Sequence, residues 1–277
     1  MVGANPTEAT LESIVNGVDA IKNQIHHCDY KQLLAQIPDA SVDLIVTDPP
    51  YGINYQNHHT KNKHEVLESD KEPFSYYDLA RECYRVMKPD TAAFFFTGWS
   101  VYPQHFIDVE RAGFEMKPTG VMQKTHSVGD LDGAFASNSE WCIHAVKGRF
   151  KFRKTNLLRY KWAEKRSAEL NGEKIEGEFK TRFPACWFGD EFPMAAEPAA
   201  FQKKYRHPTP KGQTMIMWLI QLASDKGGLV VDPFSGSGTT AAACILTDRD
   251  FITCEINEEF VATGRRRISR SHIGGFM

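Results

Sequence analysis

The sequence lacks the patterns that mark several classes of protein. Its six cysteines are scattered and no two form a C-x-x-C pair, so neither a zinc ribbon nor a thioredoxin-like redox motif is indicated. No apolar stretch is long enough to cross a bilayer, and the first residues contain no apolar signal region. These absences favour a protein of a reducing cytoplasm, with free thiols and no membrane contact.

A strong excess of charge is also lacking, because the net charge is only −2. One segment departs from this balance: residues 147–182 hold twelve Lys and Arg against five Asp and Glu, with aromatic residues interleaved. A basic segment on an otherwise acidic chain indicates contact with a polyanion such as nucleic acid, since each neutralised phosphate releases counterions. The alternative is a solvated, charge-rich insertion.

What the chain does contain is an alternation of short apolar runs and helical patterns. Residues 42–46 and 229–231 are β-branched runs typical of buried parallel strands, and residues 214–224 have helical spacing. This alternation predicts a doubly wound, mostly parallel α/β sheet of the Rossmann-like kind. Phe114–Met122 is expected to form one continuous strand.

The alternation is interrupted between about residues 149 and 206, where basic and aromatic residues gather. We interpret this region as an insertion that recognises a nucleic acid, because basic groups bind phosphates and aromatic or amide groups can meet base edges. The expected organisation is one half of an α/β domain at 21–148, the insertion at 149–206, and the other half of the same domain at 207–271.

The run at 42–46 leads directly into Asp48-Pro49-Pro50-Tyr51. Two prolines cannot donate to a sheet ladder, so the strand ends there and Asp48 lies at its carboxyl end, where α/β sheets bind ligands. The carboxylate and the neighbouring carbonyls accept hydrogen bonds, and Tyr51 offers a flat stacking ring. This combination suits a planar ring with an exocyclic amine, such as a nucleobase. The alternative is a strand followed by a Pro-Pro turn.

A second strand-end motif begins at Asp232, in Asp-Pro-Phe-Ser-Gly-Ser-Gly-Thr, and precedes an alanine-rich helix pattern. Glycines let a ligand approach the backbone, and a helix N-terminus presents free N–H groups to a carboxylate. Glu255 ends the next strand pattern, about 20 residues after the glycines, where an acidic residue accepts hydrogen bonds from ribose hydroxyls. The third glycine of a dinucleotide site is missing, which disfavours a nicotinamide cofactor.

Three histidines, His58, His59 and His64, lie in the polar stretch 52–72. The stretch lacks the apolar periodicity that would hold metal ligands rigid, so we expect no metal. A loop that closes over substrate is the favoured interpretation.

These motifs resemble those of the S-adenosylmethionine-dependent DNA amino-methyltransferases. Asp48-Pro49-Pro50-Tyr51 is similar to the catalytic motif of that N6-adenine and N4-cytosine family, Asp232 to Gly238 to its cofactor motif, and His207 to Lys211 to the preceding segment. The tetrapeptide precedes the glycine loop, with the insertion between them, which resembles the β group of the family. An Asp at the first position of the tetrapeptide is more often associated with adenine, and a Ser with cytosine.

The resemblance implies catalytic and cofactor-binding residues. The catalytic residues are Asp48, Pro49, Pro50 and Tyr51. The residues that bind S-adenosyl-L-methionine are Asp29, Asp48, Thr209, Lys211, Asp232, Phe234, Ser235, Gly236, Ser237, Gly238, Thr239 and Glu255.

The expected activity is transfer of a methyl group to the N6 amine of an adenine flipped out of double-stranded DNA. The alternatives are N4-cytosine methylation, methylation of RNA or protein, and a nucleic-acid-binding module without catalysis. A cognate restriction nuclease and a second copy of the chain are candidate partners, and the expected location is a prokaryotic or phage-type cytoplasm.

Overall fold

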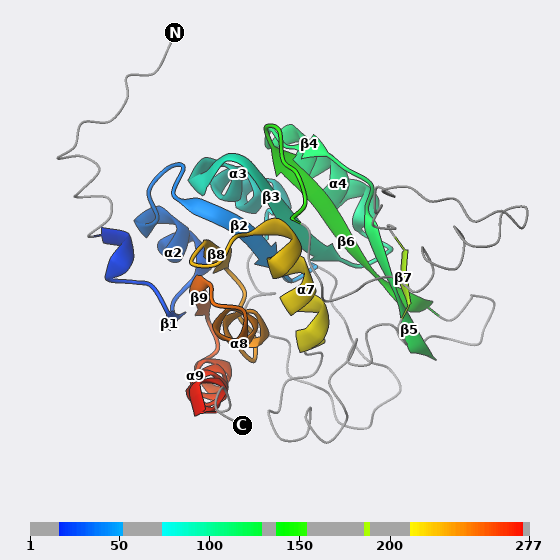
Figure 1. The fold of residues 1–277 in the computed structure, drawn as a ribbon. Helices are drawn as coiled ribbons and strands as arrows, with labels where there is room; N and C mark the ends of the chain where they lie inside the picture. Colours follow the sequence, from blue (N-terminus) through cyan, green and yellow to red (C-terminus); the bar gives the residue numbers. More distant parts are fainter. Residues whose placement is uncertain (1–16, 52–73, 129–136, 154–185, 189–210, 274–277) are drawn as a thin grey trace, which may run out of the picture.

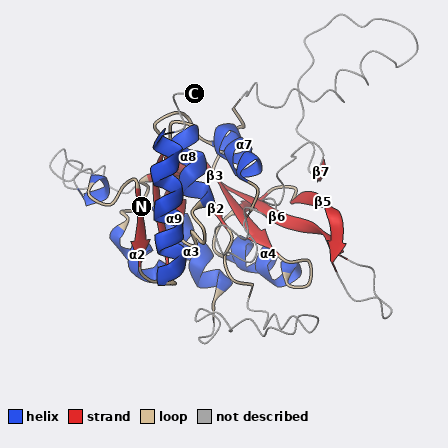
Figure 2. Cartoon of the chain, turned by 90° about the horizontal axis from the view of Figure 1, so that it is seen from below, coloured by secondary structure: helices blue, strands red, loops and turns tan. Residues whose placement is uncertain are grey.

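The computed structural model describes residues 17–51, 74–128, 137–153, 186–188 and 211–273. Within these stretches nine strands form one sheet, with helices on both faces (Figure 1 and Figure 2). The strands are β1 (Gln24–His27), β2 (Val42–Thr47), β3 (Met87–Thr97), β4 (Glu115–Met116), β5 (Gly120–Val128), β6 (Ser137–Lys147), β7 (Cys186–Phe188), β8 (Leu229–Asp232) and β9 (Asp250–Glu255). The helices are α2 (Tyr30–Gln36), α3 (Tyr76–Val86), α4 (Tyr102–Arg111), α7 (Gln213–Ala223), α8 (Thr239–Leu246) and α9 (Glu258–Ile273).

The sheet is mixed and mostly parallel, in the order β1-β9-β8-β2-β3-β6-β5-β7, and β4 pairs with β6. The first five strands of this order run parallel to one another, whereas β6 runs antiparallel to β3, β4 and β5. Parallel neighbours require crossover connections, which helices supply in a doubly wound sheet. The expected α/β fold is therefore confirmed.

Alternate side chains of the central strands enter two different cores. On β2, Leu44 and Val46 pack with residues of α7 and α8, whereas Ile45 packs with residues of α2 and α3. On β3, Phe94 and Phe95 divide between the same two cores. Because both faces of the sheet are covered, the middle residues of these strands, 44–46 and 92–96, are apolar on both faces instead of alternating with polar residues.

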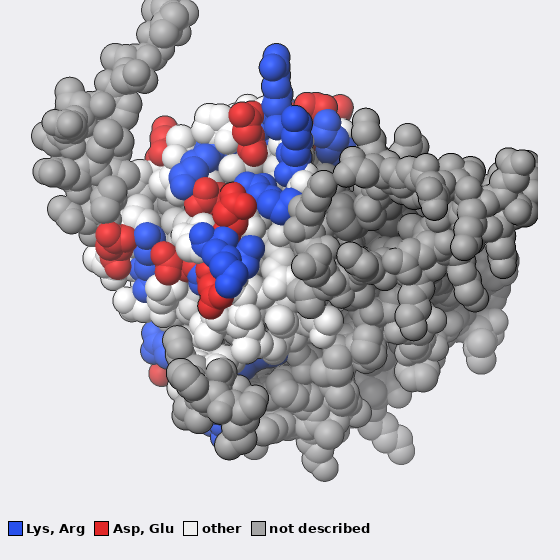
Figure 3. All heavy atoms as spheres, viewed as in Figure 1, with Lys and Arg blue, Asp and Glu red and all other residues white. Residues whose placement is uncertain are grey.

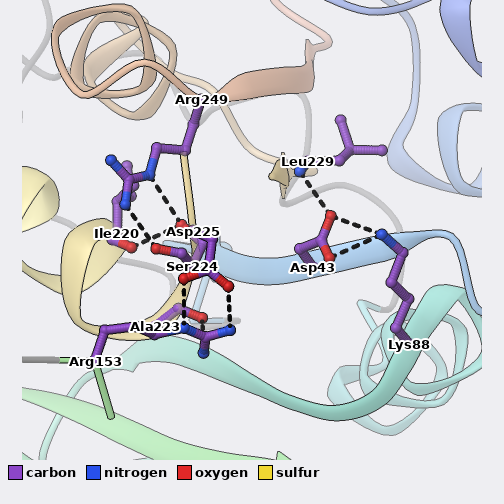
Figure 4. A network of polar contacts seen from close by, with 9 residues as sticks. All are labelled: Asp43, Lys88, Arg153, Ile220, Ala223, Ser224, Asp225, Leu229 and Arg249. Atoms are coloured by element: carbon purple, nitrogen blue, oxygen red, sulfur yellow. Dashed lines mark hydrogen bonds and ion pairs between the residues drawn. The ribbon is translucent and has the colours of Figure 1, made fainter. Parts of the chain in front are cut away.

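A polar network fastens the sheet at the amino ends of its central strands (Figure 4). Asp43 of β2 accepts a hydrogen bond from the backbone N–H of Leu229 of β8 (2.9 Å), and its carboxylate pairs with Lys88 of β3 (2.8 Å). Beside it, Arg249 donates to the carbonyl of Ser224 at the end of α7 (2.6 Å). One carboxylate thus ties three neighbouring strands at the edge opposite to Asp48.

The start of the predicted insertion packs against the α/β body. Arg153 donates its backbone N–H to the carbonyl of Leu222 (2.8 Å), and its guanidinium pairs with Asp225 (3.1 Å; Figure 4). Strand β7, from the same predicted insertion, pairs in parallel with β5. Residues 149–153 and 186–188 therefore join the main body, and the other residues of 149–206 lie outside the described part of the chain.

Two elements differ from the sequence-based expectations. Residues 114–122 form β4 and the start of β5 instead of one strand, and the break contains Pro118, which cannot donate to the ladder. Helix α9 has no counterpart among the expected elements, because charged and small residues dominate its sequence and leave a narrow apolar face.

Acidic and basic side chains of the described residues lie intermingled on the face shown in Figure 3. Most of the basic segment 147–182 lies outside the described residues, and so does the histidine-containing stretch 52–72. Among the described helices, none has the length and apolar character that crossing a membrane requires.

Candidate active site

The two strand-end motifs follow neighbouring parallel strands. β2, which precedes Asp48, pairs with β8, which ends at Asp232. The hydroxyl of Thr47 donates to Oδ1 of Asp232 (2.9 Å), so the two strand ends are directly joined. β9, which ends at Glu255, lies on the other side of β8. The predicted meeting of the tetrapeptide and the glycine loop at one edge of the sheet is confirmed, and this edge is where α/β sheets bind ligands.

Asp48 lies among polar groups from three separate segments. Its Oδ1 accepts a hydrogen bond from the hydroxyl of Tyr51 (2.8 Å), and its Oδ2 lies 2.8 Å from Nζ of Lys211. The same Nζ lies 3.2 Å from Oε2 of Glu140, at the start of β6. The side chain of Lys211 is only 10% exposed, against 28% for Asp48. The buried ammonium therefore bridges two carboxylates.

Aromatic groups from α3 and α4 lie behind Tyr51. Its ring centroid is 6.5 Å from that of His105, which stacks on Tyr76 at 3.7 Å with an interplanar angle of 14°. The hydroxyl of Thr97 hydrogen-bonds Nδ1 of His105 (2.7 Å) and fixes that ring. Burial lowers the pKa of His105 to about 4, so the ring stays neutral near neutral pH. Burial, followed by the nearby Asp48 carboxylate, holds the pKa of Tyr51 well above its usual value.

The glycine loop is organised by two acidic residues. Oδ1 of Asp232, which is 3% exposed, accepts from the backbone N–H of Phe234 (3.1 Å) as well as from Thr47. Glu255 accepts from the backbone N–H of Gly236 (3.0 Å) through Oε2 and from that of Asn257 (2.9 Å) through Oε1. Burial raises the pKa of Asp232 to about 6 and also raises the pKa of Glu255.

The second glycine of the loop allows two helices to approach closely. Gly238 has φ +78° and precedes α8, and a Cβ at this position would lie 2.9 Å from the Cα of Gly264 in α9. Gly236 also has positive φ (49°). The need for glycine at 238 thus comes from helix packing as well as from backbone conformation. No side chain caps the first turn of α8, whose N–H groups face the loop.

Arg267 supports the loop from α9. Its side chain is buried, with Nη1 donating to the hydroxyls of Ser237 (3.3 Å) and Thr239 (2.9 Å) and Nη2 donating to Oε1 of Gln213 (2.9 Å). Sequence reasoning missed this residue because α9 itself was not among the expected elements. It also missed Glu140, for which a signal exists: it is the one acidic residue of β6 and directly precedes the apolar run at 141–143.

The structure places Asp29 at the N-terminus of α2, where its carboxylate caps the helix by accepting from the backbone N–H of Lys31 (2.8 Å). It follows β1, which pairs with β9 in a register that sets His27 opposite Glu255. The ring of Tyr30 lies 5.2 Å from that of Phe234 of the glycine loop. Asp29 and Phe234 therefore border the same edge as Glu255, and their contact with a cofactor stays a prediction.

The remaining predicted residues divide as follows. Pro49 is buried and Pro50 is partly buried, directly after β2. Ser235 is buried, and its backbone N–H donates to the carbonyl of Cys254 (2.8 Å), which fixes the loop on β9. Lys211 lies at Asp48 as described, and Thr209 is outside the described residues.

Two kinds of chemistry are therefore adjacent at this edge. On the β2 side, carboxylate and carbonyl acceptors lie beside a tyrosine ring, an arrangement that can hold an aromatic amine. On the β8 and β9 side, backbone N–H groups at a helix N-terminus and a carboxylate can hold a ligand with an acid group and hydroxyls. A group-transfer reaction between two bound molecules requires this kind of adjacency.

A protein-family model described as DNA methylase, for N6 and N4 methyltransferases, matches residues 42–266. The chain is 29% identical over 260 residues to the DNA adenine methyltransferase YhdJ of Escherichia coli (strain K12), an alignment that covers 88% of this chain and 82% of that protein.

Two solved structures share the fold. The complex of M1.HpyAVI with SAM matches with a TM-score of 0.57 at 19% identity and covers 88% of this chain and 98% of that one. The PvuII DNA methyltransferase, described as cytosine-N4-specific, matches with a TM-score of 0.64 at 17% identity and covers 88% of this chain and 85% of that one. At these identities the likeness supports the fold.

Proposed function

Because the chain belongs to the DNA methylase family whose model matches residues 42–266, we propose that it transfers a methyl group from S-adenosyl-L-methionine to the N6 amine of an adenine in double-stranded DNA. The observation that carries this proposal is the hydrogen bond between Thr47 and Asp232, which sets Asp48 beside the loop at 232–239. An amine held at Asp48 and a methyl donor held by the loop then share one edge of the sheet.

Asp48 and Tyr51 form the site for the adenine in this proposal. The target base leaves the duplex at a cost of a few kcal/mol, and its ring stacks on Tyr51. The Asp48 carboxylate and the Pro49 carbonyl accept the two N6 hydrogens. Since the Tyr51 hydroxyl now occupies Oδ1 of Asp48 (2.8 Å), the amine replaces that hydroxyl when the base enters.

Hydrogen bonds from the N6 amine to the Asp48 carboxylate and the Pro49 carbonyl explain how this poor nucleophile reacts. The lone pair of an aromatic amine is delocalised into the ring, and hydrogen bonds that favour a pyramidal nitrogen direct it toward an electrophile. Positioning of this kind contributes at most about 7–11 kcal/mol to lowering a barrier. The neutral ring of His105 behind Tyr51 adds no competing charge.

The loop and Glu255 hold the methyl donor in this proposal. The N–H groups at the start of α8 suit a carboxylate, and Glu255, fixed by the N–H groups of Gly236 and Asn257, has acceptor capacity left for ribose hydroxyls. When bound, S-adenosyl-L-methionine supplies an electrophilic methyl group on a sulfonium. Phe234 and Asp29 border this site.

Adenine is favoured over cytosine by the Asp at the first position of the tetrapeptide and by the 29% identity to an adenine methyltransferase. Cytosine N4 is the second candidate, because the matching family model covers N4 as well as N6 methyltransferases. RNA or protein as substrate, and binding without catalysis, are further outcomes that the experiment below separates. A partner nuclease and a homodimer stay predictions.

The purified protein, incubated with unmethylated duplex DNA and a donor with a deuterated methyl group, should produce labelled N6-methyladenine, measured by mass spectrometry of the digested DNA. Parallel reactions contain RNA or a protein extract. Labelled N4-methylcytosine alone would overturn the adenine assignment, and labelling of RNA or protein alone would overturn the DNA assignment. Asp48→Asn should abolish the product, whereas Asp248→Asn, at an exposed carboxylate before β9, should not change it.

A further inference from the structure

Glu140 lies at the site although no role has been assigned to it. It directly precedes the part of β6 that pairs antiparallel with β3, where Trp141 lies opposite Thr97, so it reaches the edge where β3 and β2 end. Its side chain is 17% exposed, and its Oε2 lies 3.2 Å from Nζ of Lys211, which in turn lies 2.8 Å from Oδ2 of Asp48. Two carboxylates, one from the segment 48–51 and one from β6, thus converge on the ammonium group of Lys211, two residues before α7.

The order of charges in this trio is negative, positive, negative. Lys211 alone would neutralise Asp48 and weaken it as an acceptor for an amine. Glu140 restores a net charge of −1 to the group of three while Lys211 keeps one oxygen of Asp48 fixed. The other oxygen, Oδ1, is held only by the exchangeable hydroxyl of Tyr51 among the contacts described above.

We propose that Lys211 and Glu140 form a counter-charged pair that orients Asp48 and keeps it anionic during methyl transfer, an inference that rests on the proposed role of Asp48. As the nitrogen lone pair forms the new N–C bond and the C–S electron pair stays on sulfur, the amine becomes cationic. It then loses a proton to water, which restores a neutral methylamine. An oriented, anionic Asp48 stabilises the cation as it forms.

The other titratable groups around Asp48 do not supply this charge. They are Tyr51 beside it, Tyr76 of α3, Cys142 of β6 and Asp232 of β8, whose carboxylate accepts instead from the Thr47 hydroxyl and the Phe234 N–H. Burial raises the pKa of Tyr51, Tyr76 and Cys142 far enough to keep them neutral near neutral pH. Burial opposes the charge of Lys211, but the carboxylates of Asp48 and Glu140 outweigh it and raise the pKa of Lys211, which stays an ammonium.

Three variants distinguish the effect of the net charge around Asp48 from the effect of the orientation of its carboxylate. Lys211→Met makes the net charge of the trio −2, Glu140→Gln makes it zero, and the double variant returns it to −1. We would measure the single-turnover methylation rate of duplex DNA against pH, with the enzyme saturated by S-adenosyl-L-methionine. Single-turnover conditions remove product release from the rate.

The two single variants should move the pH midpoint on the acid side of this profile in opposite directions. Two unbalanced carboxylates take up a proton more readily, so Lys211→Met should raise the midpoint by about 1–3 pH units. Glu140→Gln leaves the ammonium unbalanced and should lower the midpoint by about 1 unit or less. The double variant should return near the wild-type midpoint with a lower maximal rate, because Asp48 has lost the ammonium that orients it.

Controls distinguish the alternatives. Lys226→Met removes an exposed lysine at the opposite edge and should leave the profile unchanged; melting temperatures and cofactor affinity are measured for every variant. Lys211→Arg and Glu140→Asp test for rescue if the neutral variants do not fold. If Lys211→Met loses only cofactor affinity, or if both single variants shift the midpoint in the same direction, the pair has no such role. If Asp48→Asn keeps full activity, the proposed role of Asp48 and with it this pair fails, whereas absence of DNA methylation by the wild-type protein would mean that the proposed function itself fails.

Discussion

The two halves of the site are built in different ways. The proposed cofactor half is almost contiguous in sequence: residues 232–239 form one loop, and Glu255 at the end of the adjacent strand holds it through Gly236. The proposed catalytic half is dispersed, because Lys211 joins Asp48 to Glu140 and the three residues come from distant segments. A loop can be recognised from its local pattern, whereas a charge trio exists only after the strands and α7 have come together.

The two carboxylates at the neighbouring strand ends differ accordingly. Asp232 is 3% exposed and accepts hydrogen bonds from neutral donors, the Thr47 hydroxyl and the Phe234 N–H. Asp48 is more exposed and faces a buried ammonium. The first carboxylate is suited to holding the loop in shape, and the second to meeting a substrate. The predictions below test this division, beginning with the largest expected effect.

Replacing Asp48 should lower the rate of methyl transfer without weakening cofactor binding. Asp48→Ala removes the acceptor for the amine and should lower the single-turnover methylation rate by about 10²–10³-fold or more, the usual cost of losing a group that stabilises transition-state charge. Cofactor affinity, measured by calorimetry, should stay within about threefold of wild type, an energy difference below about 1 kcal/mol. Equal losses of binding and rate would show that the halves are not separable.

Gly238→Ala should disrupt the cofactor half. The new Cβ meets the Cα of Gly264 at 2.9 Å on a backbone with φ +78°, so we expect a loss of about 2–4 kcal/mol in unfolding free energy and weaker cofactor binding. Gly227→Ala is the matched control, because Gly227 has φ +74° but nothing within 4 Å of its Cβ position. Gly227→Ala should lower the unfolding free energy by only about 1–2 kcal/mol, because it places a Cβ on a left-handed backbone without a steric clash. Equal losses in urea unfolding would contradict the role of helix packing.

The stability of the protein should depend on pH through Asp232. Because its pKa is raised to about 6 in the fold, the native state binds a proton more tightly than the unfolded chain, and stability falls as pH rises through this range. Asp232→Asn stays neutral, so its unfolding free energy relative to wild type should improve by roughly 2 kcal/mol between about pH 4 and pH 7. A difference that is independent of pH would show that Asp232 has no raised pKa.

The smallest effect should come from the Tyr51 hydroxyl. Tyr51→Phe keeps the stacking ring and frees Oδ1 of Asp48, so single-turnover rates and DNA affinity should change by less than about tenfold, which corresponds to one exchanged hydrogen bond. Tyr51→Ala removes the ring and should cost about 1–3 kcal/mol in DNA binding, the usual contribution of stacking on a base. If the two variants behave alike, the ring does not act as a stacking surface.

The sequence predicts much of the fold, the glycine loop and the tetrapeptide that follows β2. Strong apolar runs such as 42–46 and 229–231 become β2 and β8, and the loop at 232–239 follows from its glycines. It could not predict α9, whose narrow apolar face leaves little periodicity, and so it missed the support that Arg267 gives to the loop. Glu140 was missed for a different reason: its partner Lys211 is far away in the chain, and only the pairing of β6 with β3 brings them together.

The account depends most on the two strand ends forming one crevice that holds an amine and a methyl donor together. A compound that links the N6 atom of adenosine to an S-adenosyl-L-methionine analogue through a short carbon chain tests this directly, because joining two ligands of adjacent sites can raise affinity by about 10²–10⁴-fold. Calorimetry should show such a gain over the unlinked analogue, a loss of that gain in Asp48→Ala, and a smaller gain for the cytosine-linked compound. An adenosine-linked compound that binds no more tightly than the analogue alone would contradict the account.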